Sequence, residues 1–347
     1  MSSILSNSGM SGDYMSEERH IEVTAEDDDQ RLDRWLKKHI DELPWGLAQR
    51  LIRKTAIRVN DRKAKTSTRL KPGDIIRIPA IEDRTNRKKE KMQLTDDDRK
   101  LIESLVIYDD GNVVALNKPS GLASQGGGGI ERHIDGMLEL LADKKGRRPR
   151  LIHRLDRETS GVLLCARSTQ AVRRLGKAFH DRKAQKTYWA LVMPAPEEQS
   201  GTIEAPLEKG AGSMRDRMYI SESDDAKYSV TDFIVIERAA QTAAFLAFMP
   251  QTGRTHQIRV HAADALQTPI IGDDKYGGAD AKISGLKMAD TLHLHARRLV
   301  VKHPLKNEVL DLVAPLSPMM AESWTTLGFD INTADETLET LLSLQEA

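Results

Sequence analysis

The chain has 347 residues, 39% of them hydrophobic, and its 52 Lys and Arg side chains balance its 52 Asp and Glu side chains. This length favours two domains, and no apolar run is long enough to cross a bilayer. A single cysteine, Cys165, excludes an internal disulfide framework and a cysteine-rich metal site, and its apolar neighbours predict that it is buried. The first residues contain no apolar signal segment, so we expect a cytoplasmic protein.

The zero net charge conceals a strong separation of charge along the chain. Residues 1–30 carry 8 acidic side chains and 1 basic one, whereas residues 31–91 carry 19 basic and 8 acidic ones. Residues 319–347 carry 6 acidic side chains and no Lys or Arg. A basic block inside a neutral chain indicates an anionic partner, of which nucleic acid is the commonest.

The basic block overlaps a predicted small α/β domain at residues 21–80, which follows a polar tail at 1–20 that we expect to be disordered. Hydrophobic spacing and turn residues predict two helices and then two short strands, at 31–39, 46–53, 57–60 and 75–78. The sequence RLDRWL at the start of this domain and Val59-Asn60 near its middle resemble the RNA-binding domain of ribosomal protein S4.

That resemblance implies a phosphate-facing surface made of Arg50, Arg53, Lys54, Arg58, Arg62, Lys63 and Lys65. Phosphate contacts give a salt-dependent affinity with little sequence selectivity. An ordinary solvated basic face is the alternative. Acidic side chains are scarce in this region, and RNA binding is therefore the better interpretation.

A charged, aperiodic segment predicts a linker at residues 81–100, followed by a larger domain at 101–330. Strands are predicted at 106–117 (two strands and a turn), 187–192, 201–207, 227–236, 243–249 and 291–301. Helices are predicted at 134–141, 169–181 and 257–265. Many strands, few helices and non-repeating connections predict an α+β fold with a mixed, largely antiparallel sheet. An acidic helix or tail is expected at 331–347.

Residues 153–161, with the sequence HRLDRETSG, stand between two apolar segments that read as strands. A turn with four charged residues between buried strands is costly unless it faces a cleft. Arg154 and Arg157 beside Asp156 would favour its ionised form, and a positioned carboxylate can act as a nucleophile or a general base. The alternative is an Asp that accepts hydrogen bonds within a turn.

Three further sequences change that balance: LNKPSG at 116–121, KTY at 186–188 and GRTHQIRVH at 253–261. Together with HRLDRETSG, and in this order, they resemble the RluA family of RNA pseudouridine synthases over about residues 105–315. The resemblance implies an isomerase that breaks the bond between ribose and uracil, turns the base and rejoins it through carbon 5. No redox change occurs, so no cofactor is expected.

The resemblance also implies roles for single residues. Asp156 would be the catalytic carboxylate, although whether it attacks the base or the ribose, or removes a ribose proton, is left open. Arg259 would pair with Asp156, and Tyr188 would stack on the target base and be a second candidate for proton removal. The RNA- or base-binding side chains of this domain would be Arg154, Arg157, Thr159, Lys118, Arg254 and His256, with Arg154 at the base-flipping position.

The segments at 126–129, 147–150 and 273–277 resemble the subtype that modifies large-subunit (23S) ribosomal RNA. We therefore expect this RNA, or its precursor particle, as the partner. The enzyme is expected to be monomeric and to have no membrane partner. A sibling subtype with the same substrate and a tRNA-directed enzyme remain alternatives. The glycine run at 126–129 lacks the ending of a phosphate-binding P-loop, and we expect a flexible loop beside the RNA.

Two other classes compete with the isomerase. A non-catalytic assembly factor for ribosomal RNA would use the basic domain alone and would not need Asp156. A metal-dependent nuclease or glycosylase would lose its activity with a chelator, and ten histidines invite a metal site. The sequence has neither an HExxH motif nor clustered cysteines, so no metal is expected. Neither rival explains four motifs in order.

Overall fold

The computed structural model divides into two compact units, residues 1–91 and 92–347. It describes residues 18–40, 43, 45–80, 93–127, 130–214, 216–281, 283 and 285–346. Most of the predicted tail and linker, at 1–17 and 81–92, therefore lies outside the described residues, as does half of the glycine run. Among the described residues, no helix is long and apolar enough to cross a membrane.

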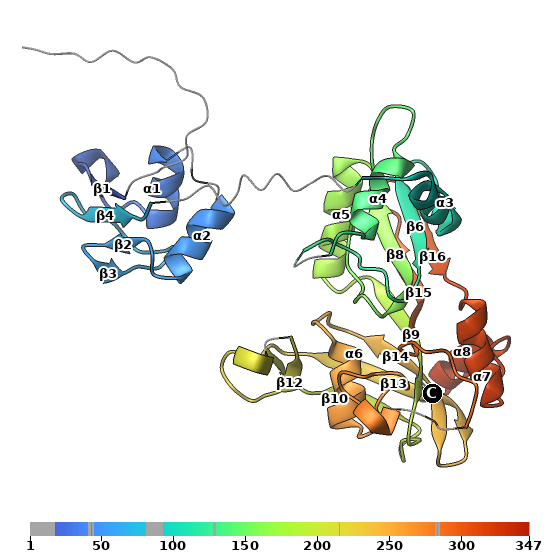
Figure 1. The fold of residues 1–347 in the computed structure, drawn as a ribbon. Coiled ribbons are helices and arrows are strands. Elements are labelled where there is room, and N and C mark those ends of the chain that lie inside the picture. Colours follow the sequence, from blue (N-terminus) through green and yellow to red (C-terminus); the bar gives the residue numbers. More distant parts are fainter. Residues whose placement is uncertain are drawn as a thin grey trace, which may run out of the picture. The chain divides into compact units, whose positions relative to one another are not determined.

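The amino-terminal unit combines two helices with a small antiparallel sheet (Figure 1). Its elements are β1 (Arg19–Glu22), η1 (Ala25–Asp27), α1 (Leu32–His39), α2 (Trp45–Arg53), β2 (Arg58–Val59), β3 (Arg62–Lys63) and β4 (Ile75–Ile78), and its strand order is β1-β4-β2-β3. Leu32, Trp35 and Leu36 recur at helical spacing and are buried together with Ile76 and Ile78 of β4. Both predicted helices of this unit are confirmed.

The second unit is built on one ten-stranded sheet. Its strands are β5 (Val106–Asp109), β6 (Val113–Lys118), β7 (Arg150–Leu151), β8 (Ser160–Ala166), β9 (Gln185–Val192), β10 (Ser200–Glu204), β13 (Val230–Ala239), β14 (Ala243–Pro250), β15 (Leu294–Lys302) and β16 (Val309–Val313). The order is β10-β13-β14-β9-β15-β8-β6-β5, with β16 beside β15 and β7 beside β8. The pairing of β15 with β8 is parallel and the other pairings in this sheet are antiparallel, so the predicted mixed, largely antiparallel sheet is confirmed. A separate hairpin joins β11 (Leu207–Lys209) to β12 (Met218–Ile220).

Helices lie on both sides of this sheet, and the predicted α+β class is confirmed (Figure 1). They are α3 (Asp96–Ser104), α4 (Ile134–Met137), η3 (Leu138–Leu141), α5 (Thr169–His180), η4 (Gly212–Met214), α6 (Gln257–Val260), the π-helical turn η5 (His261–Ala265), η6 (Gly278–Ala281), α7 (Pro318–Thr326) and α8 (Ala334–Glu346). The linker prediction extended too far, because α3 begins within it. Thr95 and Asp98 form a capping box at the start of α3, and Ile102 is fully buried.

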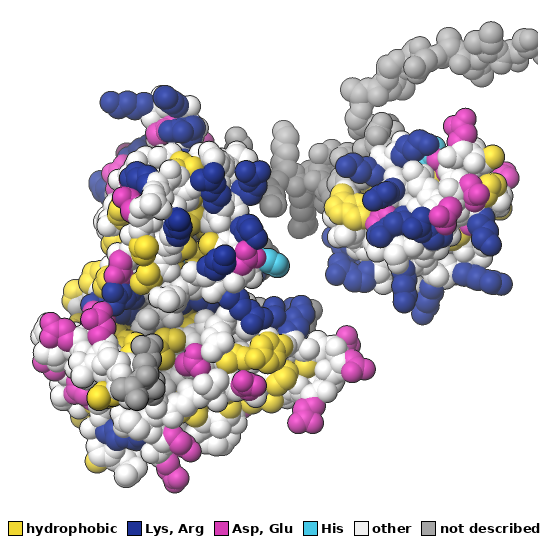
Figure 2. Space-filling model, turned by 180° about the vertical axis from the view of Figure 1, so that it is seen from behind, with side chains coloured by type: hydrophobic (Ala, Val, Ile, Leu, Met, Phe, Trp, Pro, Cys, Tyr) yellow, Lys and Arg dark blue, Asp and Glu magenta, His cyan; other side chains and the backbone are white. Residues whose placement is uncertain are grey.

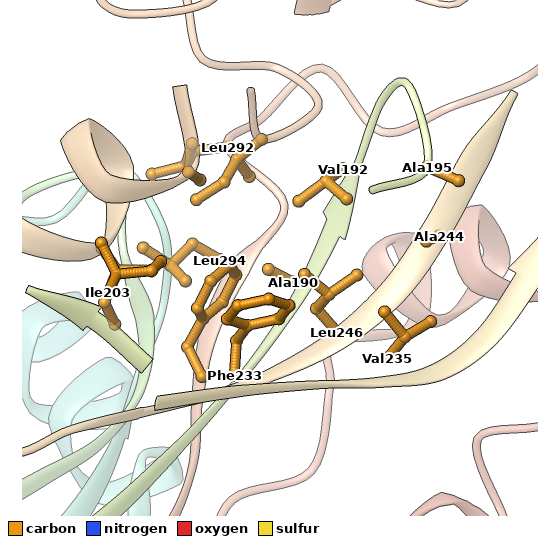
Figure 3. Packing of buried hydrophobic residues seen from close by; sticks show 14 of the residues in the cluster. Ala190, Val192, Ala195, Ile203, Phe233, Val235, Ala244, Leu246, Leu292 and Leu294 are labelled. Carbon is orange, nitrogen blue, oxygen red and sulfur yellow. The ribbon is translucent and has the colours of Figure 1, made fainter. Parts of the chain in front are cut away.

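The sheet has a hydrophobic cluster on each face, because successive side chains of a strand point to opposite faces. Ala190 and Val192 of β9 pack on one face with Phe233 and Leu246, in the cluster drawn in Figure 3. Trp189 and Leu191 of the same strand point to the other face, where α7 and α8 contribute Trp324 and Leu338. Cys165 lies on β8 with 0% of its surface exposed, which confirms the expected buried cysteine.

The two halves of the sheet meet at a narrow junction between β8 and β15. Only two residue pairs join these strands, His295 with Ser160 and Ala296 with Gly161. A side chain at Gly161 would place its Cβ 2.2 Å from the Ala296 carbonyl oxygen, and the φ of Gly161 is +108°, so glycine is required there. This junction lies directly after the predicted catalytic loop, and Tyr188 is paired with the same Ala296 from the other side.

Candidate active site

The loop at 153–159 connects β7 to β8 and is held by hydrogen bonds from the segment that follows β6. Ser124 Oγ donates to the Leu155 carbonyl (2.6 Å) and accepts the Leu155 N–H (3.1 Å). Ser120 Oγ donates to the carbonyl of Glu158 (2.7 Å). His153 accepts the N–H of Leu164 at Nε2 (3.0 Å), and burial lowers its pKa to about 4, so this ring acts as a neutral acceptor. The loop is therefore a rigid support for Asp156.

Asp156 faces a cleft of about 890 Å³, and three of the four sequence motifs line it; LNKPSG does not. Its side chain is 31% exposed, so it is open to a substrate. The charged and aromatic residues that line the cleft with it are His153, Arg154, Arg157, Phe179, His180, Arg182, Lys186, Tyr188, Arg254, His256 and Arg259. A cleft with one central carboxylate and several cations suits a polyanion whose reacting group must meet the carboxylate.

Arg259 does not pair with Asp156 in this structure, which corrects the expected ion pair. Its guanidinium instead donates from Nε and one terminal nitrogen to the two oxygens of Asp273, at 2.8 and 2.6 Å. Burial acts to lower the pKa of Arg259, but the hydrogen bonds and charge of Asp273 outweigh it and the pKa is raised. The charge of Asp156 adds to this effect, so Arg259 lies within electrostatic reach of the loop without contacting it.

His256 is the side chain that approaches the Asp156 carboxylate, with Nε2 at 3.9 Å from Oδ2. The Tyr276 hydroxyl oxygen accepts the N–H of Met218 (2.9 Å), so its hydrogen can be donated to His256 Nδ1 at 2.6 Å. The neutral ring then carries its hydrogen on Nε2, facing Asp156. Burial lowers the pKa of His256, and the nearby Asp156 charge opposes that change only in part, so the neutral ring is favoured.

Tyr188 lies on β9 and lines the cleft, close to Asp156. Burial first, and the Asp156 charge second, raise the pKa of its hydroxyl well above the usual value. The phenol therefore stays protonated, which favours stacking and hydrogen-bond donation over a role as a base.

Lys118 was expected to bind RNA, and the structure contradicts this. Its side chain is fully buried, and Nζ donates to the carbonyl oxygens of Pro119 (2.8 Å), Leu122 (2.7 Å) and Arg157 (3.0 Å). All three ammonium hydrogens are used, so no donor remains for a phosphate. Burial lowers the pKa of Lys118 to about 7, while Glu158 and Asp156 oppose that change. Lys118 ties the end of β6 to the catalytic loop.

The other predicted residues of this unit differ in exposure. Arg154 is exposed in the cleft, and Arg157 is exposed with Nε donating to the Gly121 carbonyl (2.9 Å). Thr159 is only 3% exposed, so it can meet a base only from the cleft floor. Arg254 donates from Nε to the carbonyl of Tyr228 (3.1 Å) and retains its terminal nitrogens for a ligand. The site thus brings these four side chains and Asp156 to one cleft.

Several residues that the sequence reading missed belong to the same site. Asp273 holds Arg259 and Tyr276 holds His256. Both stand in the segment 273–277 that indicated the subtype, but neither was predicted as a site residue. Lys186 stood in the KTY motif and lines the cleft. Burial, with repulsion from Arg182, lowers the pKa of Lys186 to about 8. Its place two residues before Tyr188, on the same side of a predicted strand, was the sequence signal that could have found it.

In the amino-terminal unit, Arg50, Arg53 and Lys54 are exposed at the end of α2. Arg58 is half-buried on β2 and donates from Nε to the Thr55 carbonyl (3.2 Å). Figure 2 shows dark blue Lys and Arg side chains over much of the face of this unit that it presents. Among the described residues, no group of His, Cys, Asp or Glu could hold a metal ion.

The mixed sheet, with a carboxylate, a tyrosine and cations in one cleft next to its central junction, fits the pseudouridine synthase class that the sequence motifs predicted. Residues 112–264 match the family model described as RNA pseudouridylate synthase, and residues 30–76 match the S4 domain. The solved structure of Human RNA Pseudouridylate Synthase Domain Containing 4 is 28% identical, with a TM-score of 0.59 over 69% of this chain and 99% of that one.

Curated relatives extend the match over most of the chain. Ribosomal large subunit pseudouridine synthase C of Escherichia coli is 35% identical over 85% of this chain and 92% of its own length. The proteins of that name from Rickettsia felis (35%) and Vibrio cholerae (32%) are covered over 93% and 96% of their lengths. The chain therefore belongs to the RluA family of RNA pseudouridine synthases, isomerases that convert uridine to pseudouridine in RNA, and it carries an S4 domain.

Proposed function

We propose that this enzyme converts uridines of large-subunit (23S) ribosomal RNA to pseudouridine, with Asp156 as its catalytic carboxylate. The substrate assignment rests on the names of relatives whose lengths are covered almost completely. The assignment of Asp156 is supported by its place, since it is a partly exposed carboxylate on a rigid loop in a cleft lined by several cations. Residues 21–80 would bind RNA and residues 101–330 would carry the catalysis.

In this proposal the target uridine leaves its stack and enters the cleft. Extrusion costs a few kcal/mol, which stacking on Tyr188 and hydrogen bonds to the base edge recover. Arg154 would fill the position that the base vacates, while Arg157, Thr159 and Arg254 would bind the flipped nucleotide. His256 would orient the Asp156 carboxylate through its Nε2–H, and the guanidinium of Arg259 would add positive potential beneath it.

The test is pseudouridine mapping after incubation of the wild-type enzyme, without added metal, with unmodified large-subunit ribosomal RNA and with unmodified tRNA. We expect new pseudouridine in the ribosomal RNA. New pseudouridine in tRNA alone would preserve the chemistry and contradict the substrate. Absence of product from both RNAs and from a precursor particle, with binding retained, would favour the assembly-factor alternative.

A second prediction concerns the S4 domain, whose basic residues we propose as an RNA-binding surface. Changing Arg50, Arg53 and Lys54 to Gln removes three exposed positive charges. Affinity for ribosomal RNA should fall on the order of tenfold or more, and the slope of log affinity against log salt should flatten by about 2. Filter binding at several salt concentrations measures both. An unchanged affinity and slope would contradict an RNA role for this surface.

A further inference from the structure

A second hollow, of about 490 Å³, lies outside the catalytic cleft, between the carboxy-terminal end of α5 and the turn that joins β15 to β16. We refer to it as the basic hollow. Its charged lining consists of Arg174, Lys177, Lys183, Lys302 and Lys306, with His303 and one carboxylate, Asp181. The lining therefore holds five cations and one anion, and of these cations Lys306 is also paired with Asp110 and Glu308 outside the lining, at 2.8 and 3.4 Å. The remaining excess of cations makes the basic hollow electropositive.

Part of this lining has a structural role. The His303 ring is buried; Nε2 lies 2.9 Å from Asp110 Oδ2, and Nδ1 accepts the N–H groups of Leu305 and Lys306. Lys306 Nζ also pairs with Asp110, at 2.8 Å. These bonds fix the turn after β15 and neutralise Asp110. The turn is therefore a rigid wall of the basic hollow, and not a mobile loop.

Two other cations of the lining have no such structural role. Lys183 and Lys302 are exposed, and neither has an ion pair among the described residues. Lys183 comes from the turn after α5, and Lys302 ends β15. They reach the hollow from different elements, so its charge is not explained as the solvated face of one helix. Cations without an ion pair that gather in a concave site indicate an anionic ligand.

The basic hollow is continuous in sequence with the catalytic cleft. His180 and Arg182 line the cleft, whereas Lys177, Asp181 and Lys183 line the hollow, so the end of α5 separates the two. Charge is also divided over the surface of this unit. On the face that Figure 2 presents, Lys and Arg side chains predominate over the part that holds α3 to α5, and acidic side chains are more frequent over the other part. A strand that leaves the cleft across the end of α5 would enter the hollow.

We propose that the basic hollow binds the phosphate backbone of the RNA strand that flanks the target uridine. The inference rests on the RNA substrate of the proposed function and holds for whichever RNA is modified. Lys183 and Lys302 supply the free ammonium groups, and Lys177 joins them when a phosphate displaces Asp181, its partner at 2.6 Å. Because ammonium groups bind phosphate without reading bases, the hollow adds affinity and fixes the path of the strand.

The test uses the full-length protein and an unmodified large-subunit ribosomal RNA transcript at several salt concentrations. The test variant is Lys183→Gln with Lys302→Gln. The control, Lys144→Gln with Lys145→Gln, removes the same charge from exposed positions that line neither the catalytic cleft nor the basic hollow. We expect the test variant to bind about tenfold more weakly near 0.1 M salt and to flatten the salt slope by about 1.4 relative to the control. Lys183→Arg with Lys302→Arg should restore both.

Equal losses in the test and control variants would overturn the proposal, because they would show a general effect of net charge. Failure of the Arg variant to rescue binding would also overturn it. Mapping of pseudouridine made by the wild-type protein on the same transcript reports on the proposed function separately. A transcript that is bound but not modified would therefore count against the substrate and leave the comparison of affinities valid.

Discussion

The Asp156→Asn variant should lose pseudouridine formation by at least about a thousandfold while it still binds RNA. The change keeps the shape of the side chain and removes only its charge, so neither nucleophilic attack nor proton removal by a carboxylate remains. General acid–base catalysis alone contributes roughly 10² to 10⁴ in rate. The Asp156 side chain makes no hydrogen bond among the described residues, so the free energy of unfolding should change by no more than about 0.5 kcal/mol. Single-turnover kinetics and thermal unfolding measure the two effects.

Glu158→Gln is the matched control, because it removes one negative charge from the same loop. Glu158 pairs with Arg157 at 3.5 Å at the surface. We expect this variant to retain activity. If Asp156→Asn were as active as the wild type, the catalytic role would be refuted. If the two variants lost activity equally, the loop would need net charge in general, and the proposal for Asp156 would fail as well.

The local pattern of the sequence predicted most of the elements that position this site. The apolar runs of β9 and β8 specify strands, and both lie where we expected them. Charged residues between two apolar segments marked the loop that lines the cleft, although of the flanking strands only β8 is buried and β7 is partly exposed. The glycine after Thr159 and Ser160 also has a physical reason, but one that is visible only once β15 is placed against it.

The sequence could not predict which partners the charged residues choose. Arg259 was assigned to Asp156 because family resemblance links their motifs, yet Asp273 accepts both of its hydrogen bonds from a turn 14 residues away. Lys118 was assigned to RNA because its motif resembles that of the family, although lysine is rarely buried. Its burial depends on three carbonyl groups that converge only in the folded chain. The start of α3 was missed for a simpler reason, since a Thr-x-x-Asp capping box was present but was read as linker.

Because Arg259 pairs with Asp273, we expect the Asp273→Asn variant to lose much of its stability. The pair is buried, with 7% of the Arg259 side chain and 1% of the Asp273 side chain exposed. Asp273 also accepts the N–H groups of Lys275 and Tyr276, each at 3.0 Å. Removing one partner leaves the other charge buried without compensation, which costs about 3–5 kcal/mol. Chemical denaturation of the two proteins should show a loss of this size.

A surface pair in the same unit offers a control with the same chemistry. Arg298 donates to both oxygens of Asp311, at 2.7 and 2.6 Å, but these side chains are 30% and 44% exposed. Asp311→Asn should therefore cost no more than about 1 kcal/mol. If Asp273→Asn were as mild as Asp311→Asn, water would be reaching the Arg259 pair, and its description as a buried anchor of the site would be wrong.

A double variant separates the structural role of the Arg259–Asp273 pair from the role of Arg259 in the reaction. Replacing both members, as Arg259→Leu with Asp273→Leu, removes the uncompensated charge, and apolar replacement of a buried pair is often close to neutral for stability. We expect most of the lost stability to return, while activity stays low because the positive potential beneath Asp156 is gone. Recovery of activity together with stability would show that Arg259 only holds α6 in place. Stability without activity would show that the reaction needs the cation itself.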